Sequence, residues 1–274
     1  MNRRLNFLIA IGFVVIFVII QMIAQTAVLF VEMIKDGHLN PEATLSPMGL
    51  IISTTVFSVG AIVLFVLLKW SPLSNEGRFV RERPWVLLFW CVLASVGLIL
   101  PSTYFQEVTM PSEWPEAIQQ MIDQTEQTLT LIMSTTGGYA VICLLAPVAE
   151  ELVFRGAVLR TLLEWKPERR WLMIFLSALL FALAHMNPAQ FFHPLLIGML
   201  LGWLYERTHS VLPGIIYHWV NNTAAYLIYH AYPDPDFGVA DIFGSQTNAL
   251  LAVVFSLLIA VPSIYQLYLG LRNR

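Results

Sequence analysis

Three ionisable residues lie close together in one long apolar segment of the sequence. Glu150, Glu151 and Arg155 fall inside the run 138–163, which is otherwise apolar enough to cross a membrane. One ionisable side chain at mid-span costs about 2.5–3.5 kcal/mol on the insertion scale. Glu151 and Arg155 are four residues apart and can pair on one helix face, whereas Glu150 points about 100° away. The spacing predicts a buried ion pair beside a second, free carboxylate.

Two more apolar segments carry polar residues one helical turn apart. Phe181 precedes His185, and His218 precedes Asn222. Taken singly, each polar side chain is explained by hydrogen bonding between helices. Their estimated depths lie within about 10 Å of Glu150 along the bilayer normal at 1.5 Å per residue. A carboxylate, two imidazoles and an amide at one depth supply a base or metal ligand, a water site and oxyanion donors, which is the chemistry of hydrolysis.

The composition says what kind of protein must position these groups. Of 274 residues, 57% are hydrophobic and 12% are charged, against about 25% charged in a soluble domain. The net charge of −3 offers no positive field for a polyanion, so nucleic acid is excluded as a partner. A disordered chain and an ordinary cytosolic enzyme are excluded as well. We expect an all-α, polytopic transmembrane bundle in which residues 1–274 form one integral membrane domain.

Eight segments are long and apolar enough to be candidate spans. They are residues 5–31, 49–68, 85–100, 138–163, 171–184, 191–205, 212–229 and 247–269. The fifth and sixth are short and separated by a brief turn, so a re-entrant pair is the alternative for these two.

The lysines and arginines give an independent test of this span order. With a cytoplasmic N-terminus, Lys35 is the only basic residue in an outside loop, and Arg155 lies within a span. The other thirteen of the fifteen basic residues then fall on the inside. The alternation predicts that both termini are cytoplasmic.

The outer segment 101–137 is too long and polar to be a simple turn. Ile118, Ile122, Leu129 and Ile132 recur in it at helical spacing. We expect an amphipathic helix lying at the membrane interface, and a lid over a site is the alternative.

The three polar motifs resemble those of the CPBP family of intramembrane proteases, also called the Abi family. Its EExxxR motif is similar to Glu150-Glu151…Arg155, its FxxxH motif to Phe181…His185, and its HxxxN motif to His218…Asn222. All three occur here in the family's order on separate apolar segments. The family includes endopeptidases that process prenylated CAAX proteins, so the resemblance implies an intramembrane endopeptidase with its catalytic core in residues 138–230.

The resemblance also implies roles for the site residues. Glu150 would be the general base, His185 would help to hold the water or a metal, and Glu151 with Arg155 would be a supporting pair. His218 and Asn222 would act as metal ligands or as an oxyanion hole. A divalent metal, zinc above all, would be held by Glu150, His185, His218 and Asn222, and a metal-free mechanism would use the same residues. The substrate would be a peptide or protein in or at the bilayer, prenylated in the CAAX case.

Two alternatives come from other functional classes. In a proton-coupled transporter, Glu150, His185 and His218 would form a proton relay, although the sequence shows no internal repeat. A non-catalytic membrane scaffold is the other alternative. His193, at the start of the segment 191–205, is predicted to be interfacial rather than catalytic, and the sequence leaves the oligomeric state open.

Overall fold

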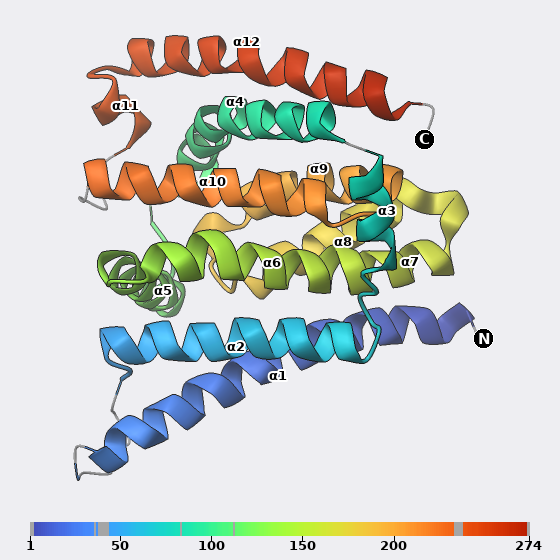
Figure 1. Cartoon of the computed structure of the whole chain (residues 1–274). Coiled ribbons are helices and arrows are strands. Elements are labelled where there is room, and N and C mark those ends of the chain that lie inside the picture. The colour runs from blue at the N-terminus through green and yellow to red at the C-terminus, as the bar shows by residue number, and fades with distance from the viewer. Residues whose placement is uncertain are drawn as a thin grey trace.

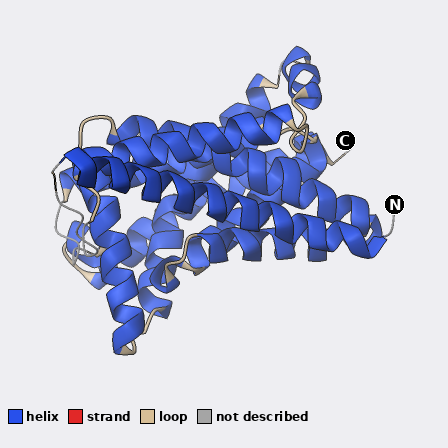
Figure 2. Cartoon of the chain, turned by 90° about the horizontal axis from the view of Figure 1, so that it is seen from below, coloured by secondary structure: helices blue, strands red, loops and turns tan. Residues whose placement is uncertain are grey.

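The computed structural model describes residues 3–35, 37, 44–82, 84–111, 113–232 and 238–272. Within these residues the chain forms helices joined by short loops, with no strand (Figure 2). The predicted all-α class is therefore confirmed.

All eight segments predicted to span the membrane are helical. The helices are α1 (Arg3–Lys35), α2 (Pro47–Leu67), α3 (Ser74–Arg81), α4 (Trp85–Thr109), α5 (Glu116–Ser134), α6 (Ala146–Glu151), α7 (Arg160–Trp165), α8 (Arg170–Ala184), α9 (Phe192–Thr208), α10 (Leu212–Ala231), α11 (Val239–Ile242) and α12 (Gln246–Leu271). By length and composition, four helices in the described part of the chain qualify as spans, namely α1 from Leu5, α2, α4 and α12. The chain is a helical integral membrane protein, and the count of eight spans stays a prediction.

The long helices run alongside one another in a bundle (Figure 1). Helix α4 packs between α12 and α10, α1 packs on α2, and α8 packs on α9. The N- and C-termini lie at the same end of the bundle in Figure 1. The helix that carries Glu150 and Glu151 contacts α2 on one side and α10 on the other, so it occupies the interior.

Helix α4 is longer than the sequence predicted. The expected span ended at residue 100, but the helix continues through Pro101 to Thr109. Proline removes the hydrogen bond to the carbonyl four residues earlier, here that of Gly97. Ser256 of α12 donates its Oγ–H to that carbonyl at 2.9 Å, which restores the lost partner. Figure 1 shows α4 bending in its second half, as expected for a helix with an internal proline.

A series of aromatic contacts connects α1 to the central helix and to α8. The Phe17 ring of α1 lies edge-on to Phe154 with centroids 5.6 Å apart, and Phe154 lies edge-on to Phe181 of α8 at 5.1 Å. Edge-to-face contacts of this kind are worth about 0.5–1.5 kcal/mol each beyond the area they bury. They fix the lateral position of α8 against the central helix.

The predicted amphipathic helix is present as α5. It buries Ile122, Ile132 and Met133 and packs against α2 and the short turn before α9. In Figure 1 α5 is seen nearly end-on while the long helices are seen lengthwise, so it lies crosswise to the bundle. The helix starts at Glu116, and the first nine residues of the predicted outer segment belong to α4 instead.

Carboxylates stabilise the N-termini of three helices. Glu32 accepts hydrogen bonds from the backbone N–H and the hydroxyl of Ser46, which in turn caps α2. Glu107 accepts the N–H of Val239 at the start of α11 at 3.0 Å. Glu76, from α3, accepts the Val211 N–H at 3.0 Å and the Ser210 hydroxyl just before α10. A negative charge at a helix N-terminus complements the exposed N–H groups and the helix dipole. The sequence did not predict α3 or α11.

Candidate active site

The central polar helix contains two π-helical stretches. Residues Ala140–Leu145 (η1) and Leu152–Leu159 (η2) flank α6, and the helix runs without a break from Ala140 to Trp165. Pro147 lies inside this continuous helix and has no N–H to donate to a carbonyl of the preceding turn. Turns of π-helix are rare and are frequently found at functional sites. Here they flank the two adjacent glutamates.

The predicted ion pair between Glu151 and Arg155 is present and fully buried. The Arg155 Nη1 lies 2.7 Å from the Glu151 Oε1, with the side chains 1% and 0% exposed. Arg155 also donates through Nη2 to the Gly198 carbonyl of α9 at 3.4 Å and lies 4.4 Å above the centre of the Phe181 ring. Its charge is thus held by α6, α8 and α9 together.

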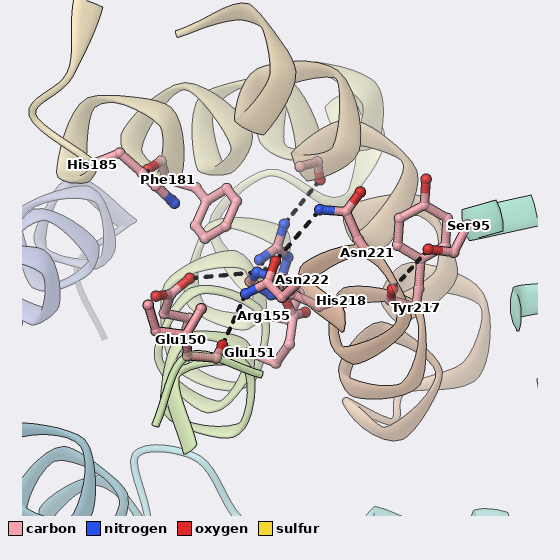
Figure 3. A network of polar contacts seen from close by, with 12 residues as sticks. Ser95, Glu150, Glu151, Arg155, Phe181, His185, Tyr217, His218, Asn221 and Asn222 are labelled. Atoms are coloured by element: carbon pink, nitrogen blue, oxygen red, sulfur yellow. Dashed lines mark hydrogen bonds and ion pairs between the residues drawn. The ribbon is translucent and has the colours of Figure 1, made fainter. Parts of the chain in front are cut away.

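His218 of α10 lies between the two adjacent carboxylates (Figure 3). Its Nδ1 is 3.3 Å from the Glu151 Oε1, and its Nε2 is 3.9 Å from the Glu150 Oε2. Because a carboxylate only accepts hydrogen bonds, Nδ1 carries the proton, and in the neutral ring Nε2 keeps its lone pair. The Glu150 Oε2 is buried and has no hydrogen-bond partner. The carboxylate that the sequence predicted to be free is therefore directed at the imidazole.

His185 lies at the end of α8 and contacts the site through Phe181. Its Nδ1 donates to the Phe181 carbonyl at 2.8 Å, and its ring lies edge-on to the Phe181 ring at 4.7 Å. The helix ends here because Met186 adopts a left-handed backbone, with φ 50°, and Asn187 then caps the next turn. The Phe181 ring also lies edge-on to His218 at 5.9 Å. One phenyl ring thus separates and positions the two imidazoles.

Asn222 of α10 faces the first π-helical stretch. Its Nδ2 donates to the Ile142 carbonyl at 3.0 Å, which leaves one amide hydrogen for another acceptor. The structure thus brings Glu150, Glu151, Arg155 and His218 into direct contact or close approach. Asn222 lies one turn along α10 from His218, and His185 joins the group through the aromatic ring.

Two residues that the sequence did not assign to the site lie beside these groups. The Asn221 Nδ2 is 3.3 Å from the His193 Nε2 and 3.4 Å from the Asn222 Oδ1. The sequence placed His193 at the membrane interface because it begins a span. The Asn-Asn pair at 221–222 was visible in the sequence, but its partner from α9 was not.

The predicted metal ligands are of suitable residue types, but their positions do not form a metal site. His185 and His218 both donate Nδ1–H to an oxygen, which is how metal-bound imidazoles are usually oriented. Over the described residues, however, no three His, Cys, Asp or Glu side chains lie close enough together to hold a metal ion. The four predicted ligands do not fit a zinc site as they are placed, so no chemical step is assigned to a metal.

Fold and site together define a helical membrane protein with a buried carboxylate–imidazole centre. Residues 133–224 match the family described as Rce1-like, type II CAAX prenyl endopeptidase, and this segment contains all six predicted site residues. The match supports the assignment of this segment to the CPBP, or CAAX protease, family that the three motifs indicated. No curated protein and no solved structure matches the chain.

Proposed function

We propose that this protein is an intramembrane endopeptidase that hydrolyses a peptide bond in a membrane-associated substrate, such as a prenylated CAAX-type tail. The observation that carries the proposal is the pair formed by Glu150 and His218. The Glu150 Oε2 is buried without a hydrogen-bond partner, 3.9 Å from the His218 Nε2, which in the neutral ring has a lone pair. Two acceptors at this separation suit a water molecule, which has two hydrogens to donate.

The reaction then follows general acid–base chemistry. Glu150 takes a proton from the water that it shares with His218, and the water oxygen attacks the peptide carbonyl carbon. The remaining N–H of the Asn222 amide donates to the oxyanion that forms. When the C–N bond breaks, protonated Glu150 returns the proton to the leaving amine.

Glu151 and Arg155 have a supporting role in this scheme. The Glu151 Oε1 accepts from both Arg155 and His218, so it holds the imidazole with Nδ1 protonated and Nε2 directed at Glu150. The guanidinium neutralises Glu151, which reduces repulsion between the two neighbouring carboxylates.

The decisive experiment compares Glu150→Gln with the wild type on a prenylated, fluorescence-quenched CAAX peptide in detergent or nanodiscs. We expect kcat to fall by about 10²–10⁴-fold, the usual contribution of a general base. Glu164→Gln is the matched control, because Glu164 is on the same continuous helix with its side chain 55% exposed. Full activity of Glu150→Gln would overturn the assignment of the base. Proton-driven solute uptake by the wild type without any cleaved peptide would favour a transporter.

A metal is tested separately by mass spectrometry of purified protein prepared without chelators. Wild type and His218→Ala are compared for zinc per chain. About one zinc in the wild type, lost in the variant, would show that the ligands rearrange to form a site. Chelator-resistant cleavage by metal-free protein supports the route through Glu150 alone.

We also propose that the chain crosses the membrane eight times with both termini in the cytoplasm. Both termini lie at one end of the bundle (Figure 1). A cavity of about 1000 Å³ is lined by four arginines that the charge pattern placed on the inside, namely Arg78, Arg160, Arg170 and Arg207. Reporter fusions at the two termini and after α5 would test this: the terminal reporters should be cytoplasmic and the third external.

A further inference from the structure

His193 is a third imidazole beside the site, and the reaction outlined above does not use it. It lies in the first turn of α9, where its Nε2 is 3.3 Å from the amide nitrogen of Asn221 on α10. The residue is partly exposed. It lies next to Pro194 in the first turn of α9, so the start of this helix sets the position of its backbone.

The chemistry of the amide settles which atom donates in this contact. An asparagine Nδ2 carries two hydrogens and never accepts, so the His193 Nε2 must accept and its Nδ1 must carry the ring proton. The second hydrogen of the Asn221 Nδ2 points to the Asn222 Oδ1, 3.4 Å away. Both hydrogens of one amide are therefore committed to His193 and to Asn222.

The same connection fixes the orientation of the Asn222 side chain. Its Oδ1 accepts from Asn221, and its Nδ2 donates to the Ile142 carbonyl at 3.0 Å. An amide turned by 180° would direct its oxygen at Ile142, where two acceptors would face each other. The contacts with Asn221 and with the Ile142 carbonyl together keep an N–H, not an oxygen, on the side of Asn222 that faces the proposed oxyanion.

We propose that His193 is a positioning residue, which acts through Asn221 to hold the amide of Asn222 in the orientation that donates to the oxyanion. The inference rests on the proposed hydrolysis, because only there does the donor face of Asn222 matter. The contact with the Asn221 amide requires a hydrogen-bond acceptor in the side chain at position 193. A side chain that merely fills space between α9 and α10 would not supply it.

The first test reads the hydrogen bond itself and needs no substrate. Protein with ¹⁵N-labelled histidine, of which the chain has six, is examined by NMR in detergent. His193→Gln identifies the His193 signals. We expect a ring with protonated Nδ1 and unprotonated Nε2, and a change of this signal in Asn221→Leu, which removes the donor. A wild-type His193 with its proton on Nε2 would overturn the proposal.

The second test reads the consequence on the prenylated peptide. His193→Ala and Asn221→Ala should each lower kcat by about 2- to 10-fold, the effect of one hydrogen bond, with KM unchanged. The double variant should be no worse than either single one, because both break the same connection. His193→Gln should recover most of the activity, since its amide oxygen can accept from Asn221. His230→Ala is the control, since this imidazole is exposed and bonds the backbone of its own helix.

Equal loss in His193→Gln and His193→Ala, or additive losses in the double variant, would overturn the positioning role. Failure of the proposed function looks different. In that case the wild type cleaves no peptide and Glu150→Gln changes nothing, while the NMR experiment still decides whether His193 accepts from Asn221.

Discussion

Two carboxylates adjacent in the chain have opposite surroundings. Glu151 is completely buried, and its Oε1 accepts from both Arg155 and His218. Glu150 is 19% exposed, and its inner oxygen has no hydrogen-bond partner. The region around Glu151 is therefore closed, with one carboxylate oxygen bonded to two partners and its Oε2 left without one. The region around Glu150 is more open, because this side chain is partly exposed and only approaches His218, at 3.9 Å.

The difference teaches how a membrane protein can keep a reactive carboxylate in its interior. The closed region around Glu151 supplies the positive charge and holds the imidazole in place. Each carboxylate keeps one oxygen without a hydrogen-bond partner, but only that of Glu150 lies beside the His218 Nε2. An unsatisfied buried acceptor costs about 1–3 kcal/mol, and the surrounding packing must offset this cost. Substitution of Glu151 should therefore lower mainly the stability of the protein, whereas substitution of Glu150 should lower mainly its activity.

The largest effect on stability is expected when Glu151 is truncated. Glu151→Ala leaves the Arg155 charge buried without its partner, which should lower the free energy of unfolding by about 3–5 kcal/mol. Glu150→Gln should not lower it, because the Glu150 Oε2 makes no hydrogen bond. Thermal unfolding in detergent, followed by circular dichroism, compares the two. Equal destabilisation would erase the distinction between the closed and open regions.

Replacing both members of the ion pair sharpens the same comparison. The double variant Glu151→Met with Arg155→Met removes both buried charges and keeps similar volume, so it should be more stable than Glu151→Ala alone. It should nevertheless cleave peptide slowly, because His218 loses the acceptor at its Nδ1. A double variant with wild-type activity would show that the closed region has no part in orienting the imidazole.

A smaller effect is expected from a methyl group placed against the closed region. A Cβ added at Gly214 of α10 would lie 2.5 Å from the Glu151 Oε2, so Gly214→Ala must push α10 or the carboxylate aside. We expect a loss of about 1–3 kcal/mol, as for other overpacked cores. Gly12→Ala in α1 is the control, because nothing lies within 4 Å of its added Cβ. Similar unfolding temperatures for both variants would contradict the close approach of α10.

The smallest effect concerns the end of the helix that carries His218. Glu76→Ala removes the acceptor for the Val211 N–H and the Ser210 hydroxyl, which should cost about 0.5–2 kcal/mol, as for a lost N-cap. Faster hydrogen exchange should appear in the first turn of α10 and not around Glu151. Glu164→Ala, at a half-exposed pair on α7, should leave this exchange unchanged.

Local periodicity accounts for what could be predicted. Each of the eight apolar segments corresponds to a helix, because helix formation in a membrane depends on runs of neighbouring residues. The four-residue spacing placed Arg155 against Glu151, because residues one turn apart share a helix face. The end of α4 was predicted wrongly, since the hydroxyl that satisfies the Gly97 carbonyl comes from Ser256, far away in the chain.

The sequence by itself determined the helical membrane class, the buried ion pair and the set of polar residues that could carry out chemistry. Only the tertiary structure decided that His218 lies between two carboxylates, that a phenyl ring separates His185 from it, and that His193 reaches Asn221. The physical reason is that these contacts join different helices. Their lateral packing depends on the shapes of side chains such as Phe154 and Phe181 and on the missing side chain at Gly214, which lets α10 approach Glu151. No local pattern encodes this packing.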